Sequence, residues 1–427
     1  MEGYGTIEGS KPGTLRTIVS NPSTRKDFAE ATDGHGKWVV RDDVIVSTVD
    51  QGGRFGSLTA GFGFNSGHIG IELGFGIRLA DRLGERVLLI KANWGGQSLG
   101  ARFRPPSAVV KRGNPQGKKL VKLPDGRKCG VRFKDILDTV RDVLGRLGEI
   151  VPNYDKAAGY ELVAFEWHQG WNDGVNFKYR LDDKKNMANE YENNLSDFIV
   201  DMRKALKSEF KCADNLPFIL GAAGFAGSPD HPKNTGKFGG FVEDSLRVIW
   251  SAYMAVGDPS KHPEVAPVHT VDSVPFAKKS DESPGTQGYH WWNNAETYYR
   301  LGRAMAEATL AALRVDSGPT SRPPSTSNSP GGFDEGACVA SCVKAGYCCN
   351  DPSVGSNQLL SCAQACKIRR SGVSSADCSK ACDKPQSCSR TVGDTTFHMC
   401  SRCSDLTQQC PHGVQDRSPC HAGCSFK

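Results

Sequence analysis

The sequence predicts an α/β domain with a parallel sheet, followed by a small disulfide-rich module at the C-terminal end. Two observations lead to this class. In residues 1–314, apolar runs alternate with helical patterns, which is typical of βαβ crossovers and of a parallel sheet covered on both faces. Fourteen of the sixteen cysteines lie between Cys338 and Cys424, whereas only Cys129 and Cys212 belong to the first domain.

Each predicted strand is a short apolar run bounded by polar or turn residues. The predicted strands are residues 87–92, 161–167, 216–222 and 268–274. The predicted helices carry apolar residues at i, i+3 and i+4 and end near glycines or charged turns. They are residues 71–83, 133–147, 187–206, 241–255 and 294–313.

Residues 315–333 consist almost entirely of Ser, Thr, Pro and Gly, a composition that cannot bury a core and behaves as a semi-extended linker. Residues 334–427 are the predicted module, whose fourteen cysteines allow seven disulfide bridges of unknown pairing. Zinc is the alternative, but only Cys400 and Cys403 have Cys-x-x-Cys spacing, and their partners are missing. Because such modules need an oxidising compartment, we expect a secreted, extracellular protein.

The charge balance excludes some partners. Lys and Arg outnumber Asp and Glu by 53 to 47, a net charge of +6, whereas a nucleic-acid-binding protein usually carries a larger, clustered excess. The sequence also contains no run of about 18 apolar residues that could cross a bilayer. We therefore expect neither nucleic acid nor membrane as a partner, and the sequence does not predict an oligomeric state.

Glycine-rich and polar segments follow two of the predicted strands, at the sheet edge where ligands of parallel sheets bind. After the first strand, Gly95 and Gly96 leave backbone N–H groups open to a ligand because no Cβ blocks the approach. After the second, residues 168–173 carry amide side chains that could donate to an oxyanion. His290 lies among aromatics at the start of the last helix, which suits acid–base chemistry. Each feature alone has a simpler interpretation, as a tight turn, a structural histidine or core aromatics.

Taken together, three blocks resemble one family. KANWGGQSLGARFRPPS, EWHQGWND and GYHWWNNAETYYRLGRAMAEA, in that order and spacing, resemble the sialate O-acetylesterase-like branch of the SGNH hydrolases, which includes the acetyl xylan esterases of carbohydrate esterase family 6. GIELGFG, at residues 70–76, is a further matching segment. The resemblance implies a three-layer α/β/α sandwich. It also implies hydrolysis of acetyl esters on poly- or oligosaccharide by a serine nucleophile, without a metal or other cofactor.

The resemblance assigns roles to four residues. Gly96 contributes a backbone N–H to the oxyanion hole, and His290 is the general base. The family usually reads His-Gln-Gly-Glu in the second block, so Gln169 matches an oxyanion donor while Trp171 replaces the acid. The wider superfamily reads Gly-x-Asn-Asp there, which makes Asn172 the competing donor.

The last block departs from the family pattern. The family often has Asp-x-x-His, but the residue three before His290 is Gln287. Such an acid fixes the tautomer and charge of the base. Either another acid, such as Asp281 or Glu282, orients His290, or the site works as a dyad.

The nucleophile is the larger departure. The family serine lies in a Gly-Gln-Ser-Asn-Met block directly after a first, central strand, and Met1-Glu2-Gly3 matches the residues that follow that serine. We therefore expect the serine and its strand upstream of Met1, which would also account for the missing signal peptide. The chain as it stands is expected to hydrolyse essentially nothing.

Two other interpretations stay open. Residues 96–100 fit Gly-x-Ser-x-Gly, the nucleophile elbow of α/β-hydrolases, which would make Ser98 the nucleophile. That elbow must lead into a helix, which Pro105 and Pro106 disfavour. The protein could also be a non-catalytic carbohydrate-binding protein that keeps an aromatic cleft; the candidate aromatics are Trp94, Trp167, Trp171, Trp291 and Trp292.

Residues 102–128 form a basic stretch, with nine Lys or Arg against the single acid Asp125. A solvated basic loop is the simpler interpretation. The more specific hypothesis is a surface that steers an anionic polysaccharide towards the site.

Overall fold

The computed structural model describes residues 2–33, 35–49, 53–113, 119–175, 187–213, 215–230 and 240–313, and beyond them the backbone of five short strands. The chain divides into two compact units, residues 1–322 and 323–427. The predicted linker, residues 315–333, lies outside the described residues, so its boundaries stay a prediction.

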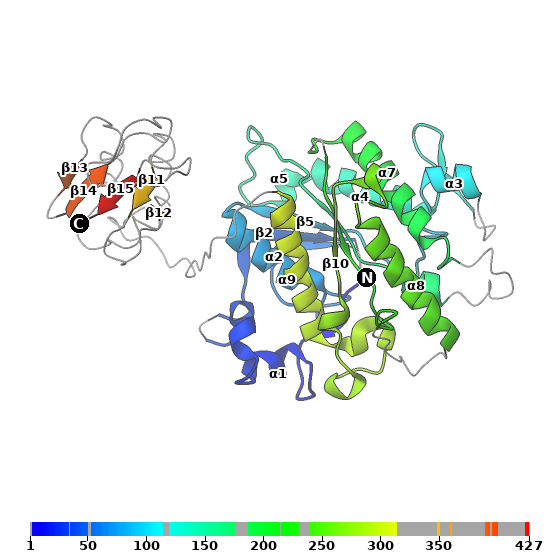
Figure 1. Cartoon of the computed structure of the whole chain (residues 1–427), viewed down its shortest axis with the longest axis horizontal. Helices are drawn as coiled ribbons and strands as arrows, with labels where there is room; N and C mark the ends of the chain where they lie inside the picture. Colours follow the sequence, from blue (N-terminus) through cyan, green and yellow to red (C-terminus); the bar gives the residue numbers. More distant parts are fainter. Residues whose placement is uncertain are drawn as a thin grey trace. The chain divides into compact units, whose positions relative to one another are not determined.

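Two three-stranded sheets form the centre of the first unit (Figure 1). One has the order β3-β2-β5, in which β2 pairs antiparallel with β3 and parallel with β5. The other has the order β10-β9-β8 and is entirely parallel. Their strands are β2 (Arg41–Thr48), β3 (Arg54–Leu58), β5 (Val87–Lys91), β8 (Phe165–Trp167), β9 (Phe218–Gly221) and β10 (Val268–Val271).

The α/β class predicted from the alternating pattern is confirmed. Each of the four predicted strands contains an observed strand, namely β5, β8, β9 and β10. The β2–β3 hairpin was not predicted, because β2 begins with Arg41, Asp42 and Asp43 and only its second half is buried.

The helices of the first unit follow the predicted pattern closely, and α2 has the predicted limits. The helices are α1 (Leu15–Ser20), α2 (Ile71–Leu83), α3 (Pro106–Arg112), α4 (Val131–Gly145), α5 (Leu147–Ile150), α6 (Trp171–Gly174), α7 (Tyr191–Glu209), α8 (Gly240–Val256) and α9 (Ala295–Ala312). Gly84 ends α2 in the left-handed conformation, and the Asn294 side chain caps α9 by accepting from Thr297 N.

Shorter elements complete the unit. β1 (Gly5–Thr6) pairs with β4 (His68–Ile69), and β6 (Val121–Lys122) pairs with β7 (Lys128–Cys129). The 3-10 helices are Arg25–Ala31, Pro263–Val265, Val274–Phe276, Ser280–Glu282 and Gly288–Asn293.

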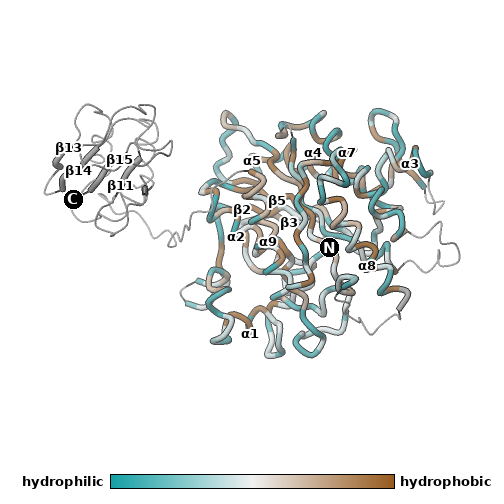
Figure 2. Tube along the Cα trace, in the orientation of Figure 1, coloured by the Kyte–Doolittle hydropathy of each residue, from teal (hydrophilic) through white to brown (hydrophobic). Residues whose placement is uncertain are grey.

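Helices cover both faces of the second sheet. Ile219 of β9 packs in a cluster with side chains of α2 and α9, including Phe75 and Met305. Its neighbours Phe218 and Leu220 point the other way, into a cluster with α4, α7 and α8, as the alternation of a strand requires. Figure 2 shows hydrophobic segments in the middle of the first unit and many hydrophilic segments at its periphery.

The second unit contains a five-stranded sheet of order β12-β11-β15-β14-β13. Its strands are β11 (Cys348–Asn350), β12 (Leu359–Leu360), β13 (Ser389–Val392), β14 (Thr395–Met399) and β15 (Gly423–Phe426). The side chains of its cysteines lie outside the described residues, so the disulfide module stays a prediction. In the first unit, Cys129 is a buried free thiol. Within the described part of the chain, no helix is long and apolar enough to cross a membrane.

Candidate active site

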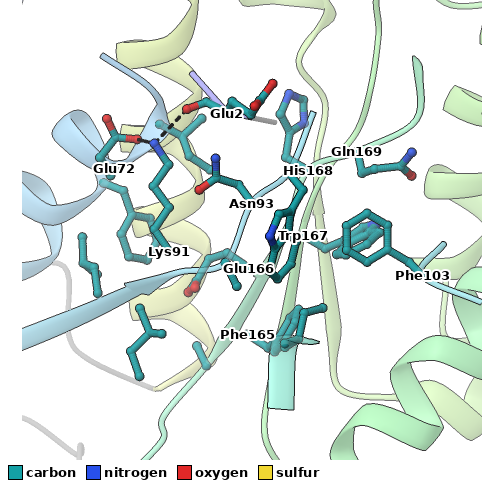
Figure 3. Close-up of a pocket in the computed structure, with 18 of the residues that line it drawn as sticks. Glu2, Glu72, Lys91, Asn93, Phe103, Phe165, Glu166, Trp167, His168 and Gln169 are labelled. Carbon is teal, nitrogen blue, oxygen red and sulfur yellow. Dashed lines mark hydrogen bonds and ion pairs between the residues drawn. The ribbon is translucent and has the colours of Figure 1, made fainter. Parts of the chain in front are cut away.

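The predicted site residues line a cavity of about 680 Å³ that β5 and β8 border. Figure 3 shows part of its wall, with Gln169 labelled. All four residues to which roles were assigned, Gly96, Gln169, Asn172 and His290, line this cavity. They come from the loop after β5, the loop after β8 with the start of α6, and the segment before α9. The structure therefore brings together residues that are far apart in sequence, whereas their chemical roles stay predictions.

The loop after β5 needs its two glycines for different reasons. Gly96 has φ +68°, a left-handed conformation that favours glycine. A Cβ on Gly95 would lie 2.7 Å from a carboxylate oxygen of Glu2. This loop therefore brings its backbone close to the N-terminal segment.

The loop after β8 is held by Asp173, a buried acid whose role the sequence did not indicate. Its carboxylate accepts from the backbone N–H groups of Leu99 at 2.9 Å and Gly100 at 2.8 Å, and from Gln169 Nε2 at 2.8 Å. Burial raises the pKa of Asp173 to about 6. Asp173 thus joins the loop after β5 to the loop after β8.

The same network constrains Gln169. Its Nε2 donates to Asp173 Oδ2 at 2.8 Å and to the carbonyl of Gln97 at 3.1 Å, which uses both amide hydrogens. In this conformation both amide hydrogens of Gln169 are therefore already engaged, and its role as an oxyanion donor stays a prediction. Asn172, the second residue of α6, is partly exposed and lines the cavity.

His290 lies in a backbone segment of unusual conformation. The three residues after it, Trp291, Trp292 and Asn293, all have positive φ, between 52° and 62°, a conformation that costs energy in non-glycine residues. The imidazole stacks on Tyr4, with ring centroids 3.7 Å apart and an interplanar angle of 17°. Burial, with a smaller contribution from His68, lowers the pKa of His290 to about 4. The ring is therefore neutral at pH 7 and able to accept a proton.

No acid among the described residues hydrogen-bonds to His290. His290 Nδ1 is buried and has no hydrogen-bond partner among the described residues. Asp281 and Glu282 are exposed, and Glu282 instead accepts from the backbone N–H of Lys279 at 3.2 Å. The choice between the two arrangements expected from the sequence therefore stays a prediction.

Two charged groups in the wall were not predicted. Glu166 of β8 borders the cavity, and burial raises its pKa to about 7. Lys91, at the end of β5, forms an ion pair with Glu72 at 3.1 Å and donates to the carbonyl of Glu2 at 2.8 Å. Figure 3 shows these side chains around the cavity.

The described wall of the cavity contains no serine or cysteine. Its one threonine, Thr309, donates its hydroxyl to the carbonyl of Met305 within α9. Ser98 is only 5% exposed and does not line the cavity, and residues 99–103 form turns, with α3 beginning at Pro106. The nucleophile-elbow interpretation of Ser98 is therefore wrong, because no helix follows the serine.

The five candidate aromatics separate into two groups. Trp94, Trp167 and Trp171 line the cavity, whereas Trp291 and Trp292 do not. Trp291 is 3% exposed and stacks on Phe225 with ring centroids 4.4 Å apart. Trp291 is therefore a core residue rather than a sugar platform.

The basic stretch is partly neutralised within the domain. Arg104 is fully buried and contacts Glu190 at 3.1 Å. Lys111 and Arg112 both pair with Asp197, at 2.7 and 2.6 Å, and Arg127 pairs with Asp125. Four of the nine basic residues therefore have acidic partners. All four reach an acid on or next to α7, since Arg127 also pairs with Asp201 at 3.5 Å. Buried acids on this helix, such as Asp197 and Asp201, are the sequence feature that could have predicted partners for these basic residues.

No group of three His, Cys, Asp or Glu side chains that could hold a metal ion occurs among the described residues.

Comparison with known proteins gives distant similarities. No family model and no curated protein matches the chain. A protein of known X-ray structure from Arabidopsis thaliana is 17% identical, with a TM-score of 0.37, over 66% of this chain and 90% of its own. A carbohydrate acetylesterase from Xanthomonas citri is 12% identical, with a TM-score of 0.38, over 74% of this chain and 57% of its own.

Proposed function

We propose that residues 1–314 form a carbohydrate esterase domain that removes O-acetyl groups from poly- or oligosaccharides. The observation that carries this proposal is the convergence of Gly96, Asn172 and His290 on one cavity. The cavity reaches the carboxyl ends of β5 and β8, where parallel sheets bind their ligands. The arrangement pairs a neutral imidazole with hydrogen-bond donors, which is what ester hydrolysis needs.

In this proposal, a serine Oγ attacks the acetyl carbonyl carbon while His290 accepts the serine proton. The negative charge that develops on the carbonyl oxygen is stabilised by the N–H of Gly96 and the amide of Asn172. The C–O bond to the sugar breaks, and His290 returns the proton to the sugar oxygen. Water then attacks the acetyl-serine with His290 again as base. The bond from the acetyl carbon to serine Oγ breaks, His290 returns the proton to Oγ, and acetate leaves.

The serine must come from a segment outside the described wall, because that wall holds no serine or cysteine. We place this serine at the end of a strand between β5 and β8, which would join the two sheets into one and complete an α/β/α sandwich. The proposal is supported by Asn172 and His290, which both line the cavity that this serine would enter.

The other parts of the proposal follow from composition. We propose that the protein acts outside the cell, because its C-terminal module is rich in cysteine. We also propose that the substrate polysaccharide is anionic. The residues that would steer it are the basic residues for which no acidic partner is named above, such as Arg102, Lys119 and Lys128.

The experiment is a fusion of an apolar strand and Gly-Gln-Ser-Asn to the N-terminus, assayed for acetate release from acetylated xylo-oligosaccharides. The serine fusion should release acetate, and a matched fusion with Ala in place of the serine should not. Replacing His290 by Ala should abolish release, whereas replacing the exposed His35 by Ala should not change it. Saturable binding of the oligosaccharide by both fusions without any release would instead identify a non-catalytic carbohydrate-binding protein.

A further inference from the structure

Three consecutive residues at the start of α7 contact three different segments of the domain. The Glu190 carboxylate accepts from Nη1 of the buried Arg104, in the segment after β5, at 3.1 Å. The Tyr191 hydroxyl lies 3.0 Å from Oε1 and 3.1 Å from the carbonyl oxygen of Gln169, in the loop after β8. Glu192 contacts the segment that precedes β10. The start of α7 therefore connects the segments after β5 and β8 to a third segment.

His262, in this third segment, lies between two carboxylates. Its Nε2 is 2.9 Å from Glu192 Oε1, and its Nδ1 is 2.8 Å from Glu264 Oε1. A neutral imidazole carries one N–H, so it can donate to only one of these oxygens, and its other nitrogen then turns a lone pair towards a carboxylate. Only the imidazolium ion donates to both. The contacts are therefore those of protonated His262, and loss of the proton removes one of the two hydrogen bonds.

The other charged groups near His262 are engaged elsewhere or exposed. They are Lys111, Arg112, Asp197, Asp258 and Lys261. The two basic residues, which belong to α3, both pair with Asp197 of α7, at 2.7 and 2.6 Å. The Asp258 carboxylate accepts from the backbone N–H of Ser260 at 2.9 Å, and Lys261 is exposed. Among the described residues, Glu192 and Glu264 are the charged groups with which the ring forms hydrogen bonds.

The two carboxylates favour the charged ring. Burial lowers the pKa of His262, but the hydrogen bonds with Glu192 and Glu264 raise it by more, so that this pKa lies above the ordinary value of 6.5. The bond with His262 in turn lowers the pKa of Glu264 below its ordinary 4.5. The bridge therefore stabilises the fold fully below about pH 6.5, and this gain is lost as the pH rises through the pKa of His262. On the acid side, the gain is lost as the pH falls through the pKa of Glu264.

We propose that His262 is a pH-sensitive positioning residue for the loop after β8. Protonated His262 fixes Glu192 to the segment before β10, and Glu192 adjoins Tyr191, whose hydroxyl contacts Gln169. When the proton is lost, the start of α7 is held less firmly, and the loop that carries Gln169 and Asn172 becomes more mobile. Any effect on ester hydrolysis rests on the proposed function, whereas the bridge and its effect on the loop do not.

The first test is an NMR titration of the His262 Cε1 proton in the full chain. We expect a pKa above 6.5 that falls in Glu192→Gln and in Glu264→Gln, because each variant replaces a carboxylate by a neutral amide. The control is Glu149→Gln on α5, which removes an exposed carboxylate from another part of the surface and should leave the titration unchanged. A pKa at or below 6.5, or one that neither variant lowers, would overturn the bridge.

The second test is hydrogen exchange of a peptide that covers residues 168–174. At about pH 5.5, we expect its amides to exchange roughly two- to fivefold faster in His262→Gln than in wild type, the loss expected for a partly exposed ion pair. At about pH 8.5, the two proteins should exchange at nearly the same rate, because the wild-type ring is then mostly neutral too. A purely structural role of the ring would accelerate exchange equally at both pH values, and this result would overturn the proposal.

A double variant tests whether the effect passes through Tyr191. Tyr191→Phe keeps the ring but removes the hydroxyl that contacts Gln169, so adding His262→Gln should then change exchange in the loop little. Peptides from α2 are the reference and should exchange equally in all variants. Faster exchange in residues 191–195 with an unchanged loop would overturn the link to the loop. Acceleration of α2 by the same factor would do so as well, because it would indicate a loss of global stability.

Discussion

The His290 imidazole stacks face to face on the ring of Tyr4, with centroids 3.7 Å apart. Phe64 stacks on the same Tyr4 ring, with centroids 4.4 Å apart. This aromatic stack positions the proposed base without a hydrogen bond to Nδ1 among the described residues, and it contributes to the burial that keeps the ring neutral.

Removing the stacking ring should change the titration of His290. With Tyr4→Ala, water reaches the imidazole, and the pKa of His290 should rise from about 4 towards the ordinary value of 6.5. Tyr4→Phe keeps the ring and should leave the pKa near its original value. The measurement is an NMR titration of the His290 Cε1 proton. Equal shifts in both variants would show that the hydroxyl of Tyr4, and not its ring, sets the pKa.

The two candidate oxyanion donors should behave differently in the serine fusion. Asn172→Ala should lower kcat/KM about 100-fold, which corresponds to about 3 kcal/mol of transition-state stabilisation. Gln169→Ala should mainly lower the stability of the fold, because Gln169 Nε2 already donates to Asp173 and to Gln97. Steady-state kinetics and urea unfolding of both variants distinguish these effects. A large loss of kcat in Gln169→Ala with unchanged stability would restore Gln169 as the donor.

Glu166 should make the fold less stable as the pH rises. Its pKa is about 7 in the fold against an ordinary value of 4.5, so the folded chain keeps a proton that the unfolded chain loses, and stability falls between pH 4.5 and 7. Glu166→Gln should therefore stabilise the fold at pH 8, by at most about 3 kcal/mol, and change little at pH 4. Water in the cavity reduces this gain.

The control for this effect is Glu161→Gln, since Glu161 also lines the cavity but is exposed. Urea midpoints at pH 4 and 8 give the comparison. A pH dependence that is the same in wild type and Glu166→Gln would contradict the assignment.

Asp173 should be more important for stability than an exposed acid. Asp173→Asn places an amide N–H₂ or a weaker acceptor against the N–H groups of Leu99 and Gly100, and should cost about 2–3 kcal/mol. Asp142→Asn, which loses an exposed pair with Arg146, should cost less than about 1 kcal/mol. Similar free energies of unfolding for the two variants would show that Asp173 does not join the loops.

The fold class and most elements of the first unit could be predicted because they depend on local pattern. Helix α2 shows this well, since its apolar periodicity ends at Gly84, a left-handed C-cap. The β2–β3 hairpin could not be predicted in the same way, because only Val44, Ile45, Val46 and the two residues after them are buried in β2.

The sequence could indicate that residues after β5 and β8 lie at one cavity, but it could not indicate the hydrogen bonds between them. The glycines after β5 and the amides after β8 stand out because they follow strands in an α/β pattern. Whether Gln169 or Asn172 has a free amide depends on Asp173 and Gln97, which are brought near only by the fold. A further strand was expected from the sequence, but that β5 and β8 border the cavity was not, because an apolar run is the same in sequence whichever strand it pairs with.

Hydrogen exchange at β5 and β8 tests the central claim most directly. The measurement compares the chain alone with the fusion that carries an apolar strand, by mass spectrometry of peptides covering residues 87–91 and 165–167. We expect the amides of both strands to exchange at least tenfold more slowly in the fusion, with β10 unchanged. Protection of neither strand, or of one strand alone, would contradict insertion between the two edges.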